Sequence, residues 1–351
     1  MPTNRRRVTL KDVAARAGVS PMTASYAFNR PARVAAATRD RVHRAASELG
    51  YLPDAVGRAL KSGRTHQIGV VFGEHLAYAF DDPQAAQFLA GVAEVCVEEG
   101  QGLTFIPTRG DAADVGRVLS AAVDGFVLWT TTEDDPVLAA VAGDPRPAVI
   151  QGGPQREGIT CVTQDDYRAA LAIASRGLTE GRTPVVISFP LDRHREHVVT
   201  TGADLRTRAP FPVTDARLRG YRAAIEQAGL SWASTPIAVV ARNTRRDGLA
   251  AARELAPQLT PEALVIAMSD ELALGARHAL QETHPDVAYL GWDASPDGRR
   301  LGITSVTNPL REQGRRCAHL ALTLDRPDNH EIPWTITPDL APVTSPPQQS
   351  L

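Results

Sequence analysis

Apolar residues recur every three or four positions along residues 10–49, which is the spacing of one face of a helix. Breaks in this pattern divide the stretch into three short segments. The first segment is expected to be helical over residues 10–16, because Thr9 and Asp12 form a capping pattern before it and Gly18 interrupts it. A short amphipathic helix is therefore predicted near the start of the chain.

A second helix follows after a turn of only a few residues. Ser20 is a preferred N-cap and Pro21 suits the first helical position, so residues 21–29 are expected to form this helix. A third helix is expected over residues 36–49, and Gly50 ends it. Two short helices joined by an Ala-Gly-Val turn form a helix-turn-helix, and the third helix completes a small all-α head.

The second helix has an inward and an outward face. Ala24, Ala27 and Phe28 share the inward face. The outward residues are Pro21, Met22, Ser25, Tyr26 and Asn29. In a helix-turn-helix the first residues of the second helix meet the base edges of DNA, while hydroxyl groups hold phosphates. The competing interpretation is a small helical bundle with an Arg-rich, solvated surface and no role in DNA binding.

From residue 67 the pattern changes to short apolar strands that alternate with longer helical segments, in two successive runs. In the first run, strands are expected at residues 68–72, 103–106, 126–129 and 148–150, with helices near 84–99, 114–121 and 135–142. In the second run, strands are expected at residues 185–188, 237–240, 264–267 and 288–291, with helices near 166–180, 215–228, 245–256 and 270–281. A last strand follows residue 303, and a last helix is expected near residues 309–324.

This alternation is typical of doubly wound parallel sheets, and two similar runs predict two lobes joined as a hinged clamp. Ligands of open parallel sheets bind outside the carboxyl ends of the strands. The cleft between the two lobes is therefore the expected binding site.

Charge is divided unevenly along the chain. Residues 1–64 carry 13 basic and 4 acidic residues, whereas the remainder carries 25 basic and 36 acidic residues. The net charge of −2 therefore hides a head of +9 and a body of −11. A basic head on an acidic body is typical of a nucleic-acid binder, because the head attracts phosphates and the body is repelled by them.

The sequence lacks the marks of several other classes of protein. No apolar run approaches the ~20 residues of a membrane span, and no signal peptide is present, so a cytoplasmic location without a membrane partner is expected. Cys96, Cys161 and Cys317 have neither disulfide nor zinc spacing and are expected to be buried. The histidines show no catalytic or metal-ligand spacing beyond the pair His194 and His197.

The common enzyme motifs are also missing, including the Walker loop, Gly-x-Ser-x-Gly, His-Glu-x-x-His and Gly-x-Gly-x-x-Gly. We therefore expect no enzymatic activity, no cofactor and no metal. A cytoplasmic solute-binding protein without a regulatory role is the alternative that remains, and the helical head argues against it.

Residues 8–29, 38–42 and 48–60 closely resemble the head of the lactose/galactose repressor (LacI/GalR) family. The resemblance implies a transcription repressor that binds double-stranded operator DNA as a homodimer, with recognition helices in the major groove and a hinge helix in the minor groove. By position, it assigns base reading to Pro21, Met22 and Tyr26, backbone positioning to Thr23, Ser25 and Asn29, a minor-groove wedge to Leu60, and further DNA contacts to Thr9, Ser20, Thr38 and Arg58.

Three positions in the head depart from the family pattern. Tyr26 stands where many members have Arg, which removes an Arg-to-guanine contact. Asp54 replaces Asn in the hinge and brings a charge that phosphates disfavour. Gly57 replaces Ala in the hinge helix, at a cost of about 1 kcal/mol of helix stability. Folding of the hinge is therefore expected to depend strongly on bound DNA.

The resemblance continues more loosely at residues 217–221, 267–275, 291–293 and 304–309. It implies an α/β domain of two lobes, like that of periplasmic binding proteins, and a small polar effector such as a sugar or sugar derivative. By motif position, it makes Arg217 the cationic anchor and Asp293 the acceptor of effector hydrogens, and lines the cleft with Asp82, Gln151, Asn243 and Ser269. The alternative for Arg217 and Asp293 is an ordinary ion pair between the lobes.

Two local features bear on the ligand. Asn243 falls roughly where relatives carry an aromatic residue that stacks on a ring, which favours a hydroxyl-rich ligand over a flat purine. Residues 191–212 form a basic segment that looks longer than in relatives and includes Arg193, Arg195, Arg206 and Arg208. The preferred interpretation of this segment is a mobile, solvated loop, and the alternative is that its charge serves a phosphorylated or acidic effector.

These observations predict a division of the chain into a helix-turn-helix domain at residues 1–52, a hinge helix and linker at 53–66, a two-lobed effector-binding and dimerisation domain at 67–343, and a disordered tail at 344–351. The N-lobe is expected to comprise residues 67–164 and 292–308, and the C-lobe residues 165–291 and 309–343. When bound to DNA, the protein is expected at the nucleoid.

Overall fold

A computed structural model describes residues 8–52, 63–75, 80–178, 182–205, 208–323 and 329–337. Contacts divide the chain into a head, which ends at Thr65, and a body, which begins at His66. The predicted hinge helix, with Arg58 and Leu60, lies outside the described residues, and so does the predicted tail at 344–351.

The described part of the head contains three α-helices, as the sequence predicted. Its elements are α1 (Leu10–Ala17), α2 (Pro21–Asn29), the 3₁₀ turn η1 (Pro31–Arg33) and α3 (Ala36–Leu49). The helices enclose a small core of Val13, Ala14, Ala24, Ala27, Val42, Ala45 and Ala46. Gly18 and Gly50 end α1 and α3 with φ values of 66° and 65°, a left-handed conformation that glycine adopts without steric strain.

The N-lobe of the body is built on a parallel sheet. Its first elements are β1 (Gln67–His75), α6 (Pro83–Glu98), β2 (Gly102–Thr108), α7 (Asp114–Leu119), β3 (Gly125–Leu128), α8 (Pro136–Ala142), β4 (Ala148–Gln151) and β5 (Thr160–Thr163). Two late elements, α14 (Leu310–Leu322) and β12 (His330–Glu331), complete it. The strand order is β12-β5-β4-β3-β1-β2, with every neighbouring pair parallel.

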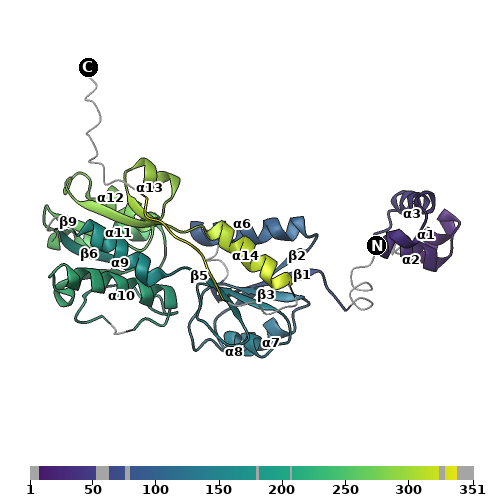
Figure 1. The fold of residues 1–351 in the computed structure, drawn as a ribbon, viewed down its shortest axis with the longest axis horizontal. Helices are drawn as coiled ribbons and strands as arrows, with labels where there is room; N and C mark the ends of the chain where they lie inside the picture. Colours follow the sequence, from purple (N-terminus) through teal and green to yellow (C-terminus); the bar gives the residue numbers. More distant parts are fainter. Residues whose placement is uncertain are drawn as a thin grey trace, which may run out of the picture. The chain divides into compact units, whose positions relative to one another are not determined.

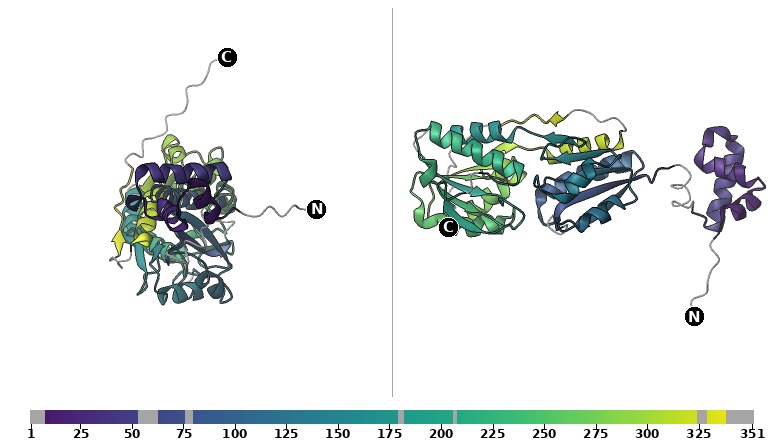
Figure 2. Two further views of the ribbon diagram at one scale, coloured as in Figure 1. Left: turned by 90° about the vertical axis from the view of Figure 1, so that its right-hand side faces the viewer. Right: turned by 90° about the horizontal axis from the view of Figure 1, so that it is seen from below.

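The C-lobe has a second sheet of similar design. Its helices are α9 (Asp166–Gly177), α10 (Pro212–Gln227), α11 (Arg245–Leu255), α12 (Asp270–Leu280) and α13 (Pro296–Arg300), with the 3₁₀ turns η2 (Trp232–Ser234) and η3 (Ala256–Gln258). Its strands are β6 (Thr183–Ser188), β7 (Val198–Thr201), β8 (Pro236–Val239), β9 (Ala263–Ala267), β10 (Ala288–Asp293) and β11 (Thr304–Thr307). The order is β11-β10-β9-β6-β8-β7, and β7 is antiparallel to β8. Figures 1 and 2 show each sheet between helices on its two faces, so the predicted doubly wound fold is confirmed.

The chain passes between the lobes three times, and this corrects one prediction. Residues 292–308, expected in the N-lobe, include β11 and the end of β10 of the C-lobe sheet. Residues 309–343, expected in the C-lobe, include α14 and β12, which belong to the N-lobe. Among the described residues after α14, a short stretch near Ile336 returns to the C-lobe, where it pairs with Val306.

Part of the segment at residues 191–212, which was expected to be a mobile, solvated loop, forms a strand. It contains β7, which hydrogen-bonds along β8 at the edge of the C-lobe sheet. Arg193, just before β7, donates to the carbonyl of Gly110 and lies 2.9 Å from Asp134, and both partners belong to the N-lobe. The segment therefore contacts both lobes. The cysteines are free and buried, as predicted.

Neighbouring helices of the body pack closely at glycines. Figure 1 shows α6 and α14 side by side on the N-lobe. A Cβ atom on Gly91 of α6 would collide with the carbonyl oxygen of Arg311, and one on Gly314 of α14 would collide with that of Phe88. Arg315 of α14 also pairs with Glu98 at 2.9 Å across the same contact. Absence of a side chain at two facing positions therefore sets the distance between these helices.

This contact predicts that Gly314→Ala will lower the free energy of unfolding by about 1–3 kcal/mol, because a backbone must move to admit the methyl group. Gly116→Ala in α7 is the matched control, since a Cβ there meets nothing within 4 Å. The control should be neutral or up to about 1 kcal/mol stabilising. Urea unfolding followed by circular dichroism measures both, and equal effects would disprove the role of the close contact.

Candidate ligand pocket and nucleic-acid interface

The start of α2 is the most exposed part of the predicted DNA-reading helix. Pro21 and Met22 lie on the surface, and 65% of the area of Met22 is exposed. Tyr26 lies one turn further along, half-buried, with the Arg30 guanidinium 6.0 Å from the centre of its ring. Asn29 donates a hydrogen bond of 3.3 Å to Ser25. These side chains form one outward surface along α2.

The other predicted DNA contacts take part in caps within the head. The backbone N–H of Thr9 donates to the Asp12 carboxylate at 2.8 Å as part of the capping box of α1, and the Thr9 hydroxyl donates to the same oxygen at 2.7 Å. The Ser20 hydroxyl oxygen accepts from the backbone N–H of Thr23 at 3.0 Å and caps α2. Thr38 accepts a long hydrogen bond of 3.5 Å from Arg41. Thr9 and Ser20 therefore fix the ends of the two helices, whatever else they contact.

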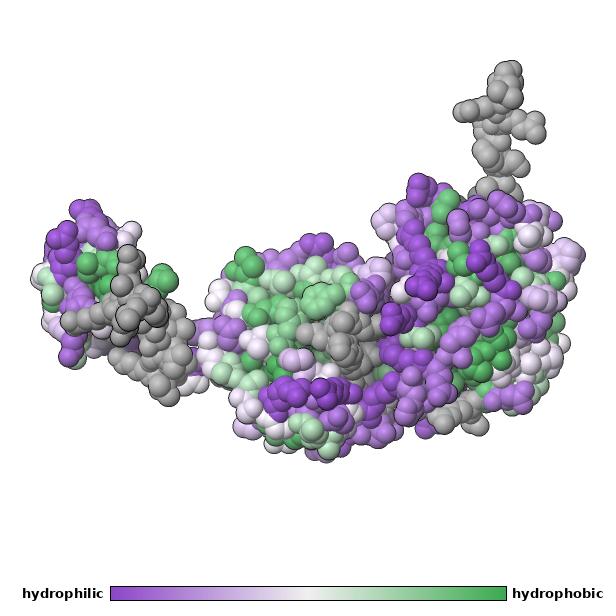
Figure 3. Space-filling view, turned by 180° about the vertical axis from the view of Figure 1, so that it is seen from behind, coloured by the Kyte–Doolittle hydropathy of each residue, from purple (hydrophilic) through white to green (hydrophobic). Residues whose placement is uncertain are grey.

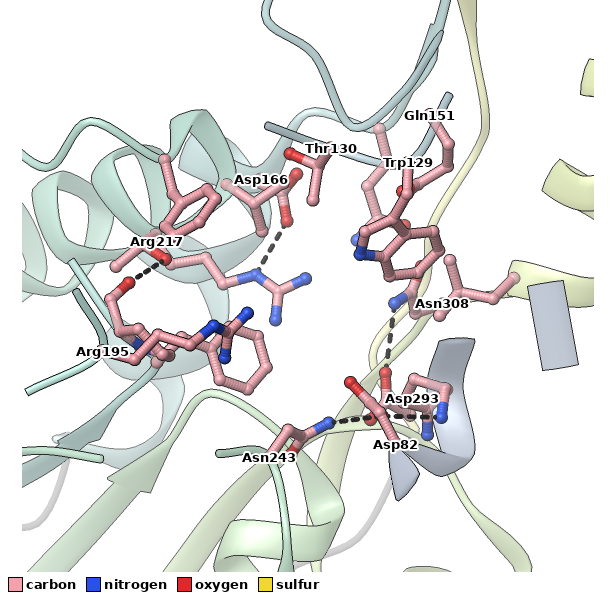
Figure 4. A pocket seen from close by; sticks show the side chains of 18 residues that line it. Asp82, Trp129, Thr130, Gln151, Asp166, Arg195, Arg217, Asn243, Asp293 and Asn308 are labelled. Carbon is pink, nitrogen blue, oxygen red and sulfur yellow. Dashed lines mark hydrogen bonds and ion pairs between the residues drawn. The ribbon is translucent and has the colours of Figure 1, made fainter. Parts of the chain in front are cut away.

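A pocket lies between the two lobes of the body, where the carboxyl ends of the strands meet (Figure 4). It encloses about 770 Å³ of space, open solvent included. The N-lobe contributes Asp82, Gln84, Trp129, Thr130, Gln151 and Gln164. The C-lobe contributes Asp166, Phe189, Arg195, Phe211, Arg217, Asn243 and Asp293, and Asn308 lies where the chain crosses between the lobes. This is the position that the doubly wound fold predicts for a ligand.

Arg217 of α10 is buried in one wall of the pocket, with 3% of its area exposed. Its Nε donates to Asp166 at 2.8 Å and its Nη1 to the carbonyl of Met268 at 2.6 Å. Its guanidinium carbon lies 3.7 Å from the centre of the Trp292 ring. Burial raises the pKa of Asp166, and the charge of Arg217 counteracts that rise. Three elements therefore hold one cation at the pocket.

Asp293 ends β10 on the opposite wall, where its backbone has a φ of 102°, a conformation that non-glycine residues rarely adopt. Its Oδ1 accepts from Asn308 at 3.1 Å. Its Oδ2 is buried and has no hydrogen-bond partner among the residues described. Burial raises the pKa of this carboxyl well above its ordinary value, and Asp270 and Asp82 raise it further. Asp293 is thus an acceptor that needs a donor or a proton.

A chain of hydrogen bonds joins the lobes beside Asp293. Ser269, the N-cap of α12, donates to Asn243 at 2.5 Å. Asn243 in turn donates to Asp82 of the N-lobe at 3.1 Å. Asp82 also caps α6 by accepting from the N–H of Gln84 at 2.9 Å. Ser269 caps α12 in the C-lobe and Asp82 caps α6 in the N-lobe, so this chain connects the starts of these two helices across the pocket.

A second chain of amides lies on the N-lobe side. Gln151 donates to Gln313 of α14 at 2.9 Å, and Gln313 donates to Asn308 at 2.9 Å. The oxygen Oε1 of Gln151 is buried, and the structure as described gives it no hydrogen-bond partner. The pocket therefore presents three buried acceptor oxygens without a partner among the described residues, on Gln151, Gln164 and Asp293, and the amide nitrogen of Gln164 is a buried donor without one. Buried acceptors of this kind favour a ligand that supplies donors.

Five of the six residues predicted from the sequence to line the cleft lie on this pocket: Asp82, Gln151, Arg217, Asn243 and Asp293. Ser269 lies behind them and positions Asn243. Sequence reasoning missed Trp129, Phe189 and Asn308 as pocket residues, although each follows the last residue of a strand (β3, β6 and β11). The rule that ligands meet the carboxyl ends of strands could have found all three.

The structure describes no group of three or more His, Cys, Asp or Glu residues that could hold a metal ion. None of the helices in the described part of the chain is long and apolar enough to span a membrane.

The buried ion pair predicts that Arg217→Ala will lower the free energy of unfolding by about 3–5 kcal/mol, because Asp166 is left buried without its counter-ion. Arg222→Ala on the same helix is the control, since the pair Arg222–Glu226 is exposed and should contribute about 0–0.5 kcal/mol. The double variant Asp166→Asn, Arg217→Ala should recover most of the loss. Chemical unfolding of the four proteins measures this, and no recovery would contradict the charge explanation.

The raised pKa of Asp293 predicts that the free energy of unfolding changes with pH. Its folded pKa is raised above the ordinary 3.8, so the folded state holds more protons than the unfolded state from about that pH upward, and stability falls as pH rises. Asp293→Asn should remove this contribution and raise the free energy of unfolding at neutral pH. Asp297→Asn is a control of opposite sign, because Arg245 and Arg300 lower the pKa of Asp297. Melting curves between pH 4 and 8 measure both, and a less stable Asp293→Asn would refute the assignment.

Comparison with known proteins agrees with the architecture. Residues 9–54 match the family described as bacterial regulatory proteins, lacI family, and residues 65–285 match periplasmic binding proteins and sugar binding domain of LacI family. The chain is 34% identical over 334 residues to the HTH-type transcriptional regulator Rv3575c of Mycobacterium tuberculosis, covering 92% of each chain. It is 31% identical over 299 residues to the ribose operon repressor of Escherichia coli, covering 81% of this chain and 82% of the repressor.

A solved structure is also similar. The transcriptional regulator CelR in complex with cellobiose aligns with a TM-score of 0.63 and 27% identity, over 94% of this chain and 98% of that one. The family identified from the head sequence is confirmed by these matches, and so is the helix-turn-helix followed by a two-lobed α/β body. The chain belongs to the LacI family of DNA-binding transcriptional regulators.

Proposed function

We propose that this regulator represses transcription, and that a small polar effector, a sugar or sugar derivative, binds between its lobes and controls its affinity for operator DNA. The observation that carries the proposal is the pocket itself, which holds a buried guanidinium and three buried acceptor oxygens, on Gln151, Gln164 and Asp293, that have no partner among the described residues. A solute-binding protein without a regulatory role is not favoured, because the chain begins with a DNA-binding domain. We also propose that it has no catalytic activity, as its relatives are regulators.

The chemistry of the pocket supports a hydroxyl-rich ligand. The free oxygens of Asp293 and Gln151 accept hydrogen bonds, and vicinal hydroxyl groups supply donors at short spacing. Trp129 and Phe189 place aromatic surface beside them, against which the C–H face of a sugar packs. The relative CelR was solved with cellobiose. In this proposal Arg217, Asp293, Asp82, Gln151 and Asn243 contact the effector, and Ser269 holds Asn243.

Coupling to DNA follows from the bond between the lobes. Asn243 of the C-lobe donates to Asp82 of the N-lobe inside the pocket, so a ligand that competes for either group changes how the lobes meet. A ligand shifts the arrangement of the lobes only by its difference in affinity for the two arrangements. A change in the arrangement of the lobes would be transmitted to the DNA-binding domain through residues 53–66. The sign of the response, induction or corepression, depends on which arrangement binds the ligand more tightly.

On DNA we propose a homodimer, with Met22 and Tyr26 of each subunit at base edges and Leu60 as the minor-groove wedge. Two features of the body support a partner surface. Phe80 and Val97 of the N-lobe expose 63% and 81% of their areas. Figure 3 shows more hydrophobic surface over the N-lobe than over most of the C-lobe on that face. Because a repressor acts on chromosomal DNA, we propose that the protein works in the cytoplasm and lies at the nucleoid when it is bound.

The test is a gel shift of the purified protein on the DNA upstream of its own gene and on a random-sequence library, with a panel of sugars and sugar derivatives. We expect specific binding that at least one ligand changes about tenfold or more, since coupling energies are typically about 1–3 kcal/mol. Tyr26→Ala should lose specific binding and keep non-specific binding, because phosphate contacts carry the latter.

Non-operator DNA at the same salt concentration is the control for each protein. Absence of any specific sequence in the selected library would overturn the DNA-binding proposal. Specific binding that no member of the panel alters would overturn the choice of a sugar-like effector while leaving the DNA-binding role in place.

A further inference from the structure

One cation of the pocket comes from the segment that precedes the antiparallel strand β7. Arg195 is half-buried and lines the pocket. Its Nη1 donates to the carbonyl of Ala241 at 3.0 Å, and its guanidinium carbon lies 5.9 Å from the centre of the Phe211 ring. Its φ of 52° is left-handed, a conformation that costs a non-glycine residue of order 1 kcal/mol. The fold therefore holds this side chain at the pocket in a strained backbone.

Arg195 lies on the same wall as Arg217. Figure 4 shows both guanidinium groups on the C-lobe side of the space, with Asp82 and Asp293 across from Arg217. Arg217 uses Nε and Nη1 for Asp166 and Met268, and a guanidinium has five N–H donors in all. The C-lobe side of the pocket thus carries two guanidinium groups, of which that of Arg217 is paired with Asp166, and the acceptor oxygens of Asp293 and Gln151 lie elsewhere on the pocket. A ligand that complements both kinds of group carries acceptors as well as donors.

We propose that Arg195 binds an anionic group of the effector, and that the effector is a polyol with one carboxylate or phosphate, such as a sugar acid or a sugar phosphate. The hydroxyl groups meet Asp293 and Gln151, and the anionic oxygens meet Arg195 beside Arg217. The proposal rests on the proposed function and specifies the ligand of the same pocket.

The physical reason is the match between groups. A guanidinium donates two parallel hydrogen bonds to carboxylate or phosphate oxygens, and such charge-assisted bonds are about twice as strong as neutral ones. A half-buried site weakens competition from water, which strengthens the attraction. A neutral sugar could satisfy Asp293 and Gln151, but it would bring only neutral acceptors to the Arg195 guanidinium.

Arg193 offers a matched control within the same segment. It carries the same charge two residues away, but it points to Asp134 and the Gly110 carbonyl of the N-lobe and does not line the pocket. Loss of Arg193 alters how the lobes meet and so acts on all ligands alike. Loss of Arg195 should act on anionic ligands alone. The ratio of affinities for an anionic ligand and its neutral parent therefore separates the two roles.

The experiment measures binding by calorimetry for full-length wild type, Arg195→Gln, Arg195→Lys and Arg193→Gln. The probes are matched sets of a neutral sugar, its uronic or aldonic acid and its phosphate ester, built on glucose, galactose, ribose and inositol. We expect an anionic member to bind the wild type most tightly. Arg195→Gln should weaken that binding about 10- to 100-fold and leave the neutral parent unchanged, Arg195→Lys should restore part of it, and Arg193→Gln should keep the ratio.

Comparison of the sugar acid with the sugar phosphate within each set shows which anionic group the site prefers. Inorganic phosphate alone is a further probe, because an anion site raises the melting temperature of wild type but not of Arg195→Gln. Tightest binding of a neutral sugar, or equal weakening of acidic and neutral members by Arg195→Gln, would overturn the proposal but leave the effector role intact. The proposal would also be overturned if no ligand of any set bound and inorganic phosphate did not change the melting temperature. Loss of the proposed function itself would appear separately, as specific DNA binding that never forms.

Discussion

The ion pair between Arg217 and Asp166 is the interaction on which the pocket depends. Asp166 is the first residue of α9, just after the chain enters the C-lobe, and Arg217 lies on α10, which packs against α9. The same guanidinium bonds to the carbonyl after β9 and stacks on Trp292 of β10. One buried cation therefore aligns two helices and two strands at a single point. Because both charges are buried, removal of either leaves the other uncompensated.

Contacts between the lobes differ in kind from those within them. Each lobe has its own apolar core, and helices such as α6 and α14 pack at glycines with little freedom to shift. Across the pocket, by contrast, the lobes meet through hydrogen bonds such as those of Asn243 to Asp82 and Arg193 to Asp134. A hydrogen bond contributes about 1 kcal/mol net, so a ligand can replace it at small cost. Rigid lobes joined by exchangeable bonds are what a ligand-controlled switch requires.

Sequence reasoning predicted the elements well because local chemistry specifies them. Caps at Thr9 and Ser20 and stops at Gly18 and Gly50 define the three head helices without reference to distant residues. The same reasoning assigned the last helix to the wrong lobe. Periodicity gives α14 an apolar face, but it does not say which sheet covers that face, and here Cys317 and Ala318 pack in the N-lobe core. Lobe assignment depends on contacts between residues far apart in sequence.

The pocket shows the same limit at finer scale. Motif position brought Arg217 and Asp293 to one cavity, yet it gave no sign that Asp166 and Trp292 hold the arginine. Asp166 belongs to none of the motifs, and the motif at residues 291–293 does not say what its tryptophan contacts. Arg195 was visible only as one charge in a basic segment, because the strand β7 and the turn before it decide where its side chain lies.

The composition of the pocket carries an unfavourable free energy that a bound ligand can offset. One oxygen of Asp293 is buried and has no donor among the described residues, and the raised pKa of this carboxyl expresses the cost of ionising it there. Asp293 and its neighbour Ala294 both have positive φ values, of 102° and 50°, which adds strain at the same point. A donor from the ligand satisfies the carboxylate only when the ligand lies in the pocket, so the gain is specific to the bound state. Groups that lower the stability of the protein without ligand are therefore the ones through which a bound ligand can change the arrangement of the lobes.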